Sequence, residues 1–454
     1  MSASAIALNR FGLGARSDEP APADPHRWLL SQFGTYEPQP SSWEPLAHTP
    51  ALLGAWLAQQ RAVRRALQGE RSGIREAYLR QGRDHYLAAV GARTGSALQT
   101  SAPFVERLVH FWSNHFAVSV DKLLVVGLTA GFEADAIRPH VLGRFEELLL
   151  AAVRHPAMLL YLDQAQSIGP GSPAGLRAEE RQRGRRGLNE NLAREILELH
   201  TLGVRSGYTQ DDVTEFARAL TGWTLPADDV VEGADATFRF VSALHEPGAR
   251  TVLGRSYADG GEEQGRAVLH DLAIAPATAR RIAHKLARHF VADDPPLALV
   301  RRLADNFART GGDLTSLYRE LVASPEAWQP AGAKFKSPWE WIISSMRALG
   351  WHEMPAGQAA SLMNQLGQPV WRPGSPAGYD DVAATWAAPD ALLRRVEVAQ
   401  RLAAQAGDAL DARGLAPRVL PGALSDATAG AISRAESNGT ALALLLVSPE
   451  FLRR

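Results

Sequence analysis

The sequence has no cysteine, and only four of its 48 basic residues are lysines: Lys122, Lys285, Lys334 and Lys336. The absence of cysteine excludes disulfides, zinc–thiolate sites, iron–sulfur clusters and cysteine nucleophiles. The scarcity of lysine leaves few candidates for a Schiff base or for a phosphate-binding lysine. Histidine and carboxylate side chains are therefore the main candidates for chemistry.

Charge, hydropathy and motif content exclude further classes. The 48 basic and 49 acidic residues give a net charge of −1, which argues against nucleic acid as a partner. The longest apolar runs, residues 148–153 and 441–447, are far shorter than the roughly 20 residues that cross a membrane, so we expect no membrane span. No phosphate-binding, dinucleotide-binding, nucleophile-elbow or His-Glu-x-x-His motif is present, so no cofactor is indicated. Residues 1–10 lack the basic leader of a secretion signal, and the chain as given predicts a cytoplasmic location.

Hydrophobic periodicity predicts helices along nearly the whole chain, for example over residues 144–153 and 391–404. Capping boxes at Ser337–Glu340 and Thr209–Asp212 predict two helix starts. Strand patterns are scarce, and those at residues 236–241 and 250–253 are expected to pair as a small hairpin.

The predicted fold is therefore mostly α-helical: an irregular multi-helix globular domain with at most a small β-hairpin. One large domain is expected over residues 1–454, because no composition shift marks a linker. Glycine and proline predict a flexible loop at about 168–188 and a second, Pro/Gly-rich loop at about 369–379.

The segment at residues 103–119, PFVERLVHFWSNHFAVS, combines histidine, asparagine and tryptophan. His115 lies on its apolar face, where it is either a core histidine with hydrogen-bonded ring nitrogens or a general base or metal ligand. His110 lies about 140° away around the helix, so the two histidines are not expected to chelate one metal. Two other histidines five residues apart, His284 and His289, are interpreted as part of a solvated or interface face.

The segment at residues 189–203, NENLAREILELHTLG, places Asn191, Glu195 and Glu198 on one strip of a helix. These side chains form either a solvated face laced with ion pairs to Arg194 or part of a site. Glu195 borders the apolar stripe, where burial raises the pKa of a carboxyl group toward that of a general acid. His200 falls in the last turn, and the spacing gives only a weak metal signature.

Two further segments contain candidate residues. Asp163 follows the apolar turn MLLYL at residues 158–162, and it either caps the following loop or belongs to a site. Residues 207–223 are expected to form a helix–loop–helix with the segment at 189–203, with Gly222 where a helix C-cap belongs, and they lack the ligand spacing of a calcium loop.

Four ordered blocks resemble the bacterial domain-of-unknown-function family eighteen-hundred: HFWSNHFAVS, MLLYLDQAQS, GLNENLAREILELHTLGV and GYTQDDVTEFARALTGWT. Three later stretches are similar to further blocks of that family: KLARHFVADDPP, AKFKSPWEW and PVWRPGSPAGY. The resemblance covers most of the chain and implies a large, mostly helical domain. The candidate site residues that it carries over are Asn114, His115, Asp163, Asn189, Glu190, Asn191, Arg194, Glu195, Glu198, His200 and Trp223.

The resemblance also implies a setting. Many relatives carry an export signal and are encoded beside a sulfatase-like companion, which implies a periplasmic or secreted location. This chain departs from them because it has no such signal. It also has Asp163-Gln164 where relatives tend to have Asp-Asn, and its proline-rich block lacks their Gly-Trp-Pro-Gly-Gly.

The leading hypothesis is an enzyme whose pocket gathers His115, Asp163 and Glu195 for acid–base work, with hydrolysis or elimination on a glycan or similar polar substrate as the expected reaction. Glu195 acts as general acid and Asp163 as its paired carboxylate. His115 or His200 orients groups or relays a proton, and Glu198 completes the set. The substrate-binding candidates are Asn114, Asn189, Asn191, Arg194, Trp112 and Trp223, with the two tryptophans as stacking surfaces.

Two alternatives stay open. In the first alternative, the chain is a hydrolase or oxidase in which a divalent metal is bound by His115, Glu195, Glu198 and His200. In the other alternative, the chain is a non-enzymatic helical binding or assembly partner of the sulfatase-like companion. Convergence of Asp163, Glu195 and His115 on one concave pocket would favour the enzyme.

Overall fold

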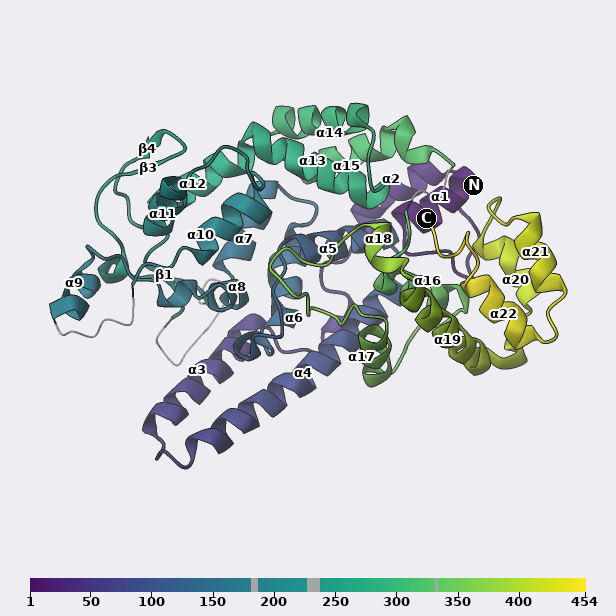
Figure 1. Ribbon diagram of the computed structural model, residues 1–454, viewed down its shortest axis with the longest axis horizontal. Helices are drawn as coiled ribbons and strands as arrows, with labels where there is room; N and C mark the ends of the chain where they lie inside the picture. The colour runs from purple at the N-terminus through teal and green to yellow at the C-terminus, as the bar shows by residue number, and fades with distance from the viewer. Residues whose placement is uncertain (181–186, 227–236, 331–333) are drawn as a thin grey trace.

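The computed structural model describes residues 1–180, 187–226, 237–330 and 334–454, and these are mostly α-helical (Figure 1). Within these ranges, strands form only two antiparallel pairs. The prediction of a mostly helical fold is confirmed. No helix of the described ranges has the length and apolar character needed to span a membrane.

The α-helices of the described residues have these bounds: α1 Ala3–Ile6, α2 Pro25–Thr35, α3 Thr49–Arg65, α4 Arg71–Gln99, α5 Pro103–His115, α6 Thr129–Gly131, α7 Phe145–Arg154, α8 Pro156–Tyr161, α9 Pro173–Glu180, α10 Asn191–Glu195, α11 Gln210–Ala219, α12 Glu262–Ile274, α13 Pro276–Phe290, α14 Leu297–Thr310, α15 Leu314–Ala323, α16 Pro338–Ala348, α17 Ala356–Gln365, α18 Ala383–Trp386, α19 Pro389–Ala406, α20 Ala412–Val419, α21 Asp426–Ser433 and α22 Asn438–Leu446.

Three segments have π-helical geometry, and each follows directly on a short α-helix: η1 (Ala7–Phe11), η4 (Phe132–Ile137) and η7 (Ile196–His200). At the end of η7 the backbone N–H of Thr201 donates to the carbonyl of Ile196, five residues earlier. Within the described ranges, single 3₁₀ turns make up the remaining helical elements: η2 Ser41–Trp43, η3 Leu123–Val125, η5 Arg138–His140, η6 Gln164–Gln166, η9 Ser242–Leu244, η10 Pro325–Trp328 and η11 Gly407–Ala409.

Both predicted capping boxes are confirmed. Ser337 Oγ accepts from the N–H of Glu340, whose Oε2 accepts in return from the N–H of Ser337 at 2.9 Å. Thr209 and Asp212 make the same reciprocal pair at the start of α11. These hydrogen bonds satisfy N–H groups that a helix start leaves without intrahelical partners.

The predicted strand pairing is wrong. β2 (Arg239–Phe240) pairs with β1 (Trp223–Thr224), whereas β3 (Arg250–Val252) pairs with β4 (Arg255–Tyr257). The reason is a two-residue turn at Leu253 and Gly254, both at positive φ (53° and 75°), which returns the chain so that β3 meets the residues just after it. Residue 236, the start of the predicted strand, lies outside the described residues.

The two predicted loops have different outcomes. Residues 369–379 contain neither helix nor strand, as predicted, and lie in the loop from residue 366 to 382 that joins α17 to α18, hereafter the α17–α18 loop. The loop expected at 168–188 instead contains the helix α9. α9 starts at a local capping signal: Ser172 Oγ accepts from the N–H of Gly175, and Pro173 occupies the first helical position. The glycine and proline content of the segment predicted a loop despite this signal. Residues 181–186 lie outside the described residues.

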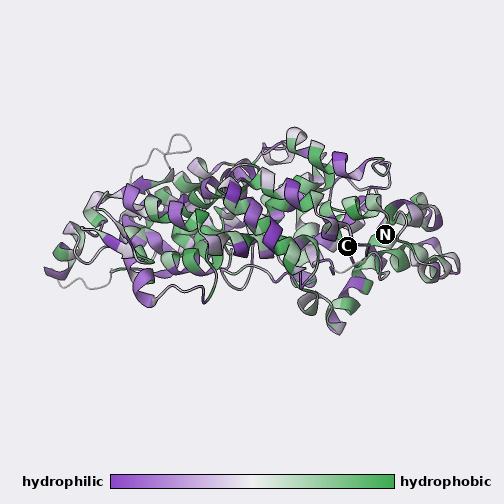
Figure 2. Cartoon of the chain, turned by 90° about the horizontal axis from the view of Figure 1, so that it is seen from above, coloured by the Kyte–Doolittle hydropathy of each residue, from purple (hydrophilic) through white to green (hydrophobic). Residues whose placement is uncertain are grey.

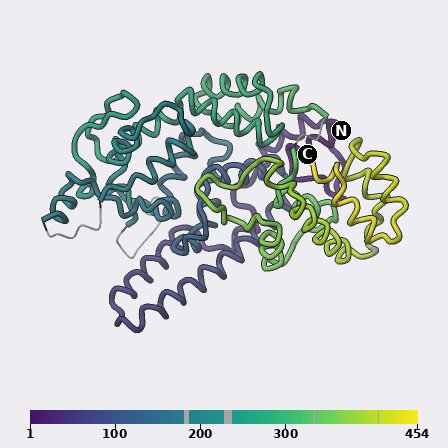
Figure 3. The backbone as a smooth tube through the Cα atoms, viewed as in Figure 1, coloured from purple at the N-terminus to yellow at the C-terminus, as the bar shows by residue number. Residues whose placement is uncertain are grey.

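Buried hydrophobic side chains form two large clusters, and the N-terminal segment contributes to both: Ile6 and Phe11 to one, Leu8 and Leu13 to the other. Along the helices, hydrophobic and hydrophilic residues alternate, as Figure 2 shows, because most helices bury one face. Figure 3 shows α3 and α4 as a hairpin that projects from the rest of the molecule. α5 lies centrally, and nearly all of its residues are buried, so it positions side chains toward several elements.

Candidate functional site

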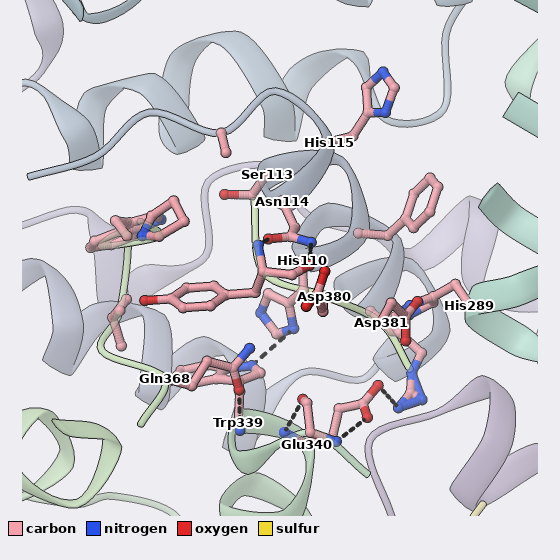
Figure 4. A pocket seen from close by; sticks show the side chains of 18 of the residues that line it. His110, Ser113, Asn114, His115, His289, Trp339, Glu340, Gln368, Asp380 and Asp381 are labelled. Atoms are coloured by element: carbon pink, nitrogen blue, oxygen red, sulfur yellow. Dashed lines mark hydrogen bonds and ion pairs between the residues drawn. The ribbon is translucent and has the colours of Figure 1, made fainter. Parts of the chain in front are cut away.

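A pocket of about 270 Å³ lies between α5, α13, the start of α16 and the α17–α18 loop. Figure 4 shows the side chains that converge on it, from His110 and Asn114 of α5 to Asp381 of the loop. We call it the α5 pocket. Its lining combines histidines, carboxylates and basic groups with aromatic rings, so it offers both proton carriers and apolar surface.

The α17–α18 loop is fastened to α5 through Asn114. The backbone N–H of Tyr379 donates to Asn114 Oδ1 at 2.7 Å, and Asn114 Nδ2 donates to the carbonyl of Tyr379 at 2.9 Å. Gly378 has a φ of +81°, and a Cβ there would lie 2.3 Å from the backbone oxygen of Asn114. This close approach requires glycine, and it makes the loop one wall of the pocket.

His289 and Asp381 form a hydrogen-bonded pair in the α5 pocket. His289 Nδ1–H donates to Asp381 Oδ2 at 2.7 Å, which leaves the lone pair on Nε2, and Nε2 has no hydrogen-bond partner among the described residues. Burial lowers the pKa of His289, although Asp381 opposes this, so the ring is neutral near pH 7. Burial raises the pKa of Asp381, but the electrostatic interaction with His289, the hydrogen bond from His289 and the charge of Lys334 lower it by more, so the carboxyl group is ionised.

Lys285 and His115 form a second pair at the wall made by α13 and α5. Lys285 Nζ lies 2.9 Å from His115 Nδ1, while His115 Nε2–H donates to the carbonyl of His200 at 3.1 Å. Burial, with the charge of Lys285 adding to it, holds the pKa of His115 well below its usual value. Burial lowers the pKa of Lys285 to about 7, with Arg281 adding to the effect and Asp381 opposing it. Lys285 therefore exchanges its proton near neutral pH.

The floor of the α5 pocket is an ion network around Glu340. Glu340 Oε1 lies 2.7 Å from Arg107 and 2.8 Å from Arg454. Burial raises the pKa of Glu340, but the two arginines lower it by more, to about 2. Beside it, Trp339 Nε1–H donates to His110 Nδ1 at 3.2 Å, and burial holds the pKa of His110 well below its usual value.

Of the residues proposed from the sequence, His115 and Asn114 line this pocket, and Asp163, Glu195 and Glu198 do not. The alternative weighed for His115, a core histidine with both ring nitrogens hydrogen-bonded, matches its contacts. The amide of Asn114 is occupied by the chain itself. The expected convergence on one pocket is thus limited to these two positions.

The remaining polar candidates lie along α10 and the turn after α8. Asp163 has a φ of +58°, and its Oδ1 accepts from Lys122 Nζ at 2.6 Å. Asn189 Nδ2 donates to the carbonyl of Asp163 at 3.5 Å, and Asn189 Oδ1 accepts from the N–H of the exposed Asn191. The two segments therefore touch through Asn189.

Glu195 is partly buried, as the sequence predicted. Burial raises its pKa, the charge of Glu198 adds to this effect, and Arg194 opposes it. Arg194 lies 3.1 Å from Glu190 and 3.7 Å from Glu198, so the ion-pair-laced face that was the alternative interpretation is also present.

His200 is turned into the core by the π-helical segment η7. Its ring centroid lies 6.1 Å from that of His115, and neither of its ring nitrogens has a hydrogen-bond partner in the part of the chain that the structure describes. Burial lowers the pKa of His200 to about 3, and the charges of Lys285 and Arg281 add to this. It is therefore a neutral residue between the α5 pocket and α10.

The two tryptophans proposed as stacking surfaces are fully buried. Trp112 Nε1–H donates to the hydroxyl of Tyr318 at 2.6 Å inside the core. Trp223 packs edge-on against Phe238, with ring centroids 5.2 Å apart. Neither presents a ring face to a substrate in solution, because Trp112 lies on the buried helix α5 and Trp223 is buried in β1, beyond the end of α11 at Ala219.

The metal-binding alternative requires four side chains to lie close enough to bind one ion: His115, Glu195, Glu198 and His200. Among the described residues no three histidine, aspartate or glutamate side chains are arranged so that they could hold a metal ion. The ring nitrogens of His115 are already used by Lys285 and by the carbonyl of His200. These four residues do not form the expected ligand set.

The comparison with protein families decides what the chain is related to. The model of the family described as "Protein of unknown function (DUF1800)" matches residues 6–453. The chain belongs to this family. No curated protein and no solved structure matches it. The family description gives no activity, so the chemistry of this DUF1800 member has to be argued from its own side chains.

Sequence reasoning missed Lys285, His289 and Asp381 as site residues of this DUF1800 member. His289 was interpreted as part of a solvated or interface face, and Lys285 was noted only because lysine is rare. The signal that pointed toward them was the position of KLARHF and PVWRPGSPAGY in two of the later blocks that resemble the family. Asp381 follows the second block by two residues.

Proposed function

We propose that this DUF1800 member is an enzyme that performs general acid–base chemistry on a polar organic substrate in the α5 pocket. The observation that carries the proposal is the hydrogen bond from His289 Nδ1–H to the ionised Asp381, which leaves Nε2 as an unpartnered base within the described residues. A carboxylate that orients an imidazole in this way fixes its tautomer and stabilises the imidazolium that forms when the base takes a proton.

Lys285 supplies the second proton carrier. Its pKa of about 7 lets it donate or accept a proton near neutral pH, and it lines the same pocket as His289. A base and an acid in one pocket suit reactions in which one proton is removed and another is delivered. Hydrolysis and elimination are both of this kind.

The lining supports a substrate rich in hydroxyl or other polar groups, and a glycan is the leading class. Trp339, Trp371 and Tyr379 offer aromatic surface, and Gln368 and Ser113 offer hydrogen-bonding groups beside it. Sugars bind to such mixed surfaces because their C–H faces pack on rings while their hydroxyls form hydrogen bonds.

The test is an activity screen of the full chain against neutral and acidic oligosaccharides, with products followed by mass spectrometry and by the ultraviolet absorbance of a new double bond. His289→Gln and Asp381→Asn should each lower turnover at least about 100-fold, the typical contribution of general acid–base catalysis. His270→Gln is the matched control, since His270 Nδ1 also lies close to a carboxylate, 2.9 Å from Glu146, but outside the pocket. Turnover that survives His289→Gln would refute the proposal.

A second candidate places the chemistry at Glu195, which is favoured by its raised pKa. Glu195 would then act as general acid and Asp163 as its paired carboxylate, as the sequence predicts. Glu195→Ala would abolish turnover with little change in the melting temperature, while His289→Gln would retain activity. This pattern distinguishes the two locations.

A further inference from the structure

Three basic residues follow one another on a single face of α13: Arg281, Lys285 and Arg288, at spacings of four and three residues. Arg281 Nε–H donates to the carbonyl of Leu199 at 3.1 Å, and Arg288 Nε–H donates to that of Asp293 at 3.0 Å. In the described residues none of the three basic groups forms an ion pair with a carboxylate. Of the two arginines, Arg288 lines the α5 pocket, so it places positive charge there beside Lys285.

Lys285 differs from the other three lysines in its surroundings. Lys122 is paired with Asp163 at 2.6 Å. Lys334 is paired with Asp293, also at 2.6 Å. Lys336 does not line the α5 pocket, and it is almost completely buried with its ammonium 4.2 Å from the centre of the Phe451 ring.

The position of Lys285 is fixed by His115, and its surroundings favour the neutral amine. Because His115 Nε2–H donates to the carbonyl of His200, its Nδ1 carries a lone pair and accepts a hydrogen bond from Lys285. Burial disfavours the positive charge of Lys285, as do Arg281 and Arg288 on α13, whereas Asp381 in the α17–α18 loop opposes this. A lysine that is desolvated beside other cations is activated as a nucleophile.

We propose that Lys285 forms a Schiff base in the α5 pocket with a small carbonyl compound that carries a carboxylate, such as a 2-oxo acid. The carboxylate is attracted by Arg288, which lines the pocket and has no acidic partner among the described residues. The inference uses the pocket of the proposed function but does not depend on His289 acting as a base.

The reaction is balanced without any further reactant. The lone pair of Lys285 Nζ attacks the carbonyl carbon, a C–N bond forms, and the π electrons of the carbonyl move to oxygen. A proton passes from nitrogen to oxygen and gives a carbinolamine. The oxygen then leaves as water with both protons of the amine, and a C=N bond remains.

The test traps the imine in the full chain. The protein is incubated at pH 7 with pyruvate and sodium cyanoborohydride, which reduces the imine to a stable secondary amine, and labelled peptides are quantified by mass spectrometry. We expect labelling of Lys285 at least about 10-fold faster than that of Lys122, which has an acidic partner. Because the chain has only four lysines, all of them are compared in one experiment. Equal labelling of the four lysines, or none at Lys285, overturns the inference.

Further controls test the carboxylate requirement and the assignment to Lys285 separately. Hydroxyacetone is a ketone of similar size without a carboxylate, and it should label Lys285 several-fold more slowly than pyruvate does. Equal rates would overturn the anionic part of the proposal. His270→Gln, which lies outside the pocket, should leave the labelling unchanged. The oligosaccharide screen tests His289 and the imine trap tests Lys285, so a failure of the proposed base and a failure of this inference are told apart. Lys122→Arg should also retain the label at Lys285, whereas Lys285→Arg should lose it.

Discussion

Replacing Gly378 by alanine should detach the α17–α18 loop from α5 and open one wall of the pocket. The added Cβ would lie 2.3 Å from the backbone oxygen of Asn114 and 2.7 Å from its Oδ1. Neither atom can move far, because the first belongs to the backbone of a buried helix and the second accepts the N–H of Tyr379. The loop therefore has to give way.

The magnitude follows from two contributions. Alanine at a φ of +81° costs about 1 kcal/mol in backbone strain. Separation of the loop also breaks the two hydrogen bonds between Asn114 and Tyr379, each worth about 1 kcal/mol. We expect the free energy of unfolding to fall by about 3 kcal/mol.

Gly367→Ala is the matched control. Gly367 has nearly the same φ, +82°, and lies in the same loop, but no atom lies within 4 Å of its would-be Cβ. It should lose only the strain contribution, about 1 kcal/mol. Urea unfolding measures both losses, and hydrogen exchange at the amide of Tyr379 should quicken in Gly378→Ala alone. If the two variants unfold alike and that amide stays protected, the loop is not held in the way described.

The other stability predictions concern two carboxylates. Glu340→Gln keeps the capping oxygen but removes the charge between Arg107 and Arg454. Since folding lowers the pKa of Glu340 from 4.5 to about 2, we expect the free energy of unfolding to fall by about 3 kcal/mol at pH 7, and this loss should shrink as the pH is lowered below 4.5. Asp212→Asn, at a capping carboxylate without an arginine partner, should lose less. A flat pH dependence of the difference would contradict this. The pKa of Glu195 is raised, so the charged form is disfavoured in the folded state. Glu195→Gln should therefore gain stability relative to the wild type as the pH rises from 4 to 7, measured by denaturant titration at each pH. A relative loss over that interval would show that the carboxylate is stabilising.

Local signals predicted local structure well. The capping box at Ser337–Glu340 predicted the start of α16, and the glycine and proline content of residues 369–379 predicted a segment without helix or strand. Each signal depends on hydrogen bonds or backbone angles within a few residues, so the printed sequence contains all the information that is needed.

The pocket could not be predicted in this way. Asn114 and Tyr379 are 265 residues apart, and His289 and Asp381 are 92 apart, so no spacing rule connects them. The spacing of apolar residues also failed to distinguish the pocket residues of α5 from its core residues, because that helix is buried on nearly every side. A helix wheel tells which residues share a face, but Trp112 shows that it does not tell whether the face meets a pocket or the core.

The π-helical segment η7 has a consequence for comparisons between family members. A π turn holds about one residue more than an α turn, so residues 196–200 are geometrically equivalent to an α-helix with a one-residue insertion. In a relative without the extra residue, an alignment would show a single gap here, and a different side chain would lie against His115. Such a gap would identify a position at which relatives differ in the side chain that packs against His115, the hydrogen-bond partner of Lys285.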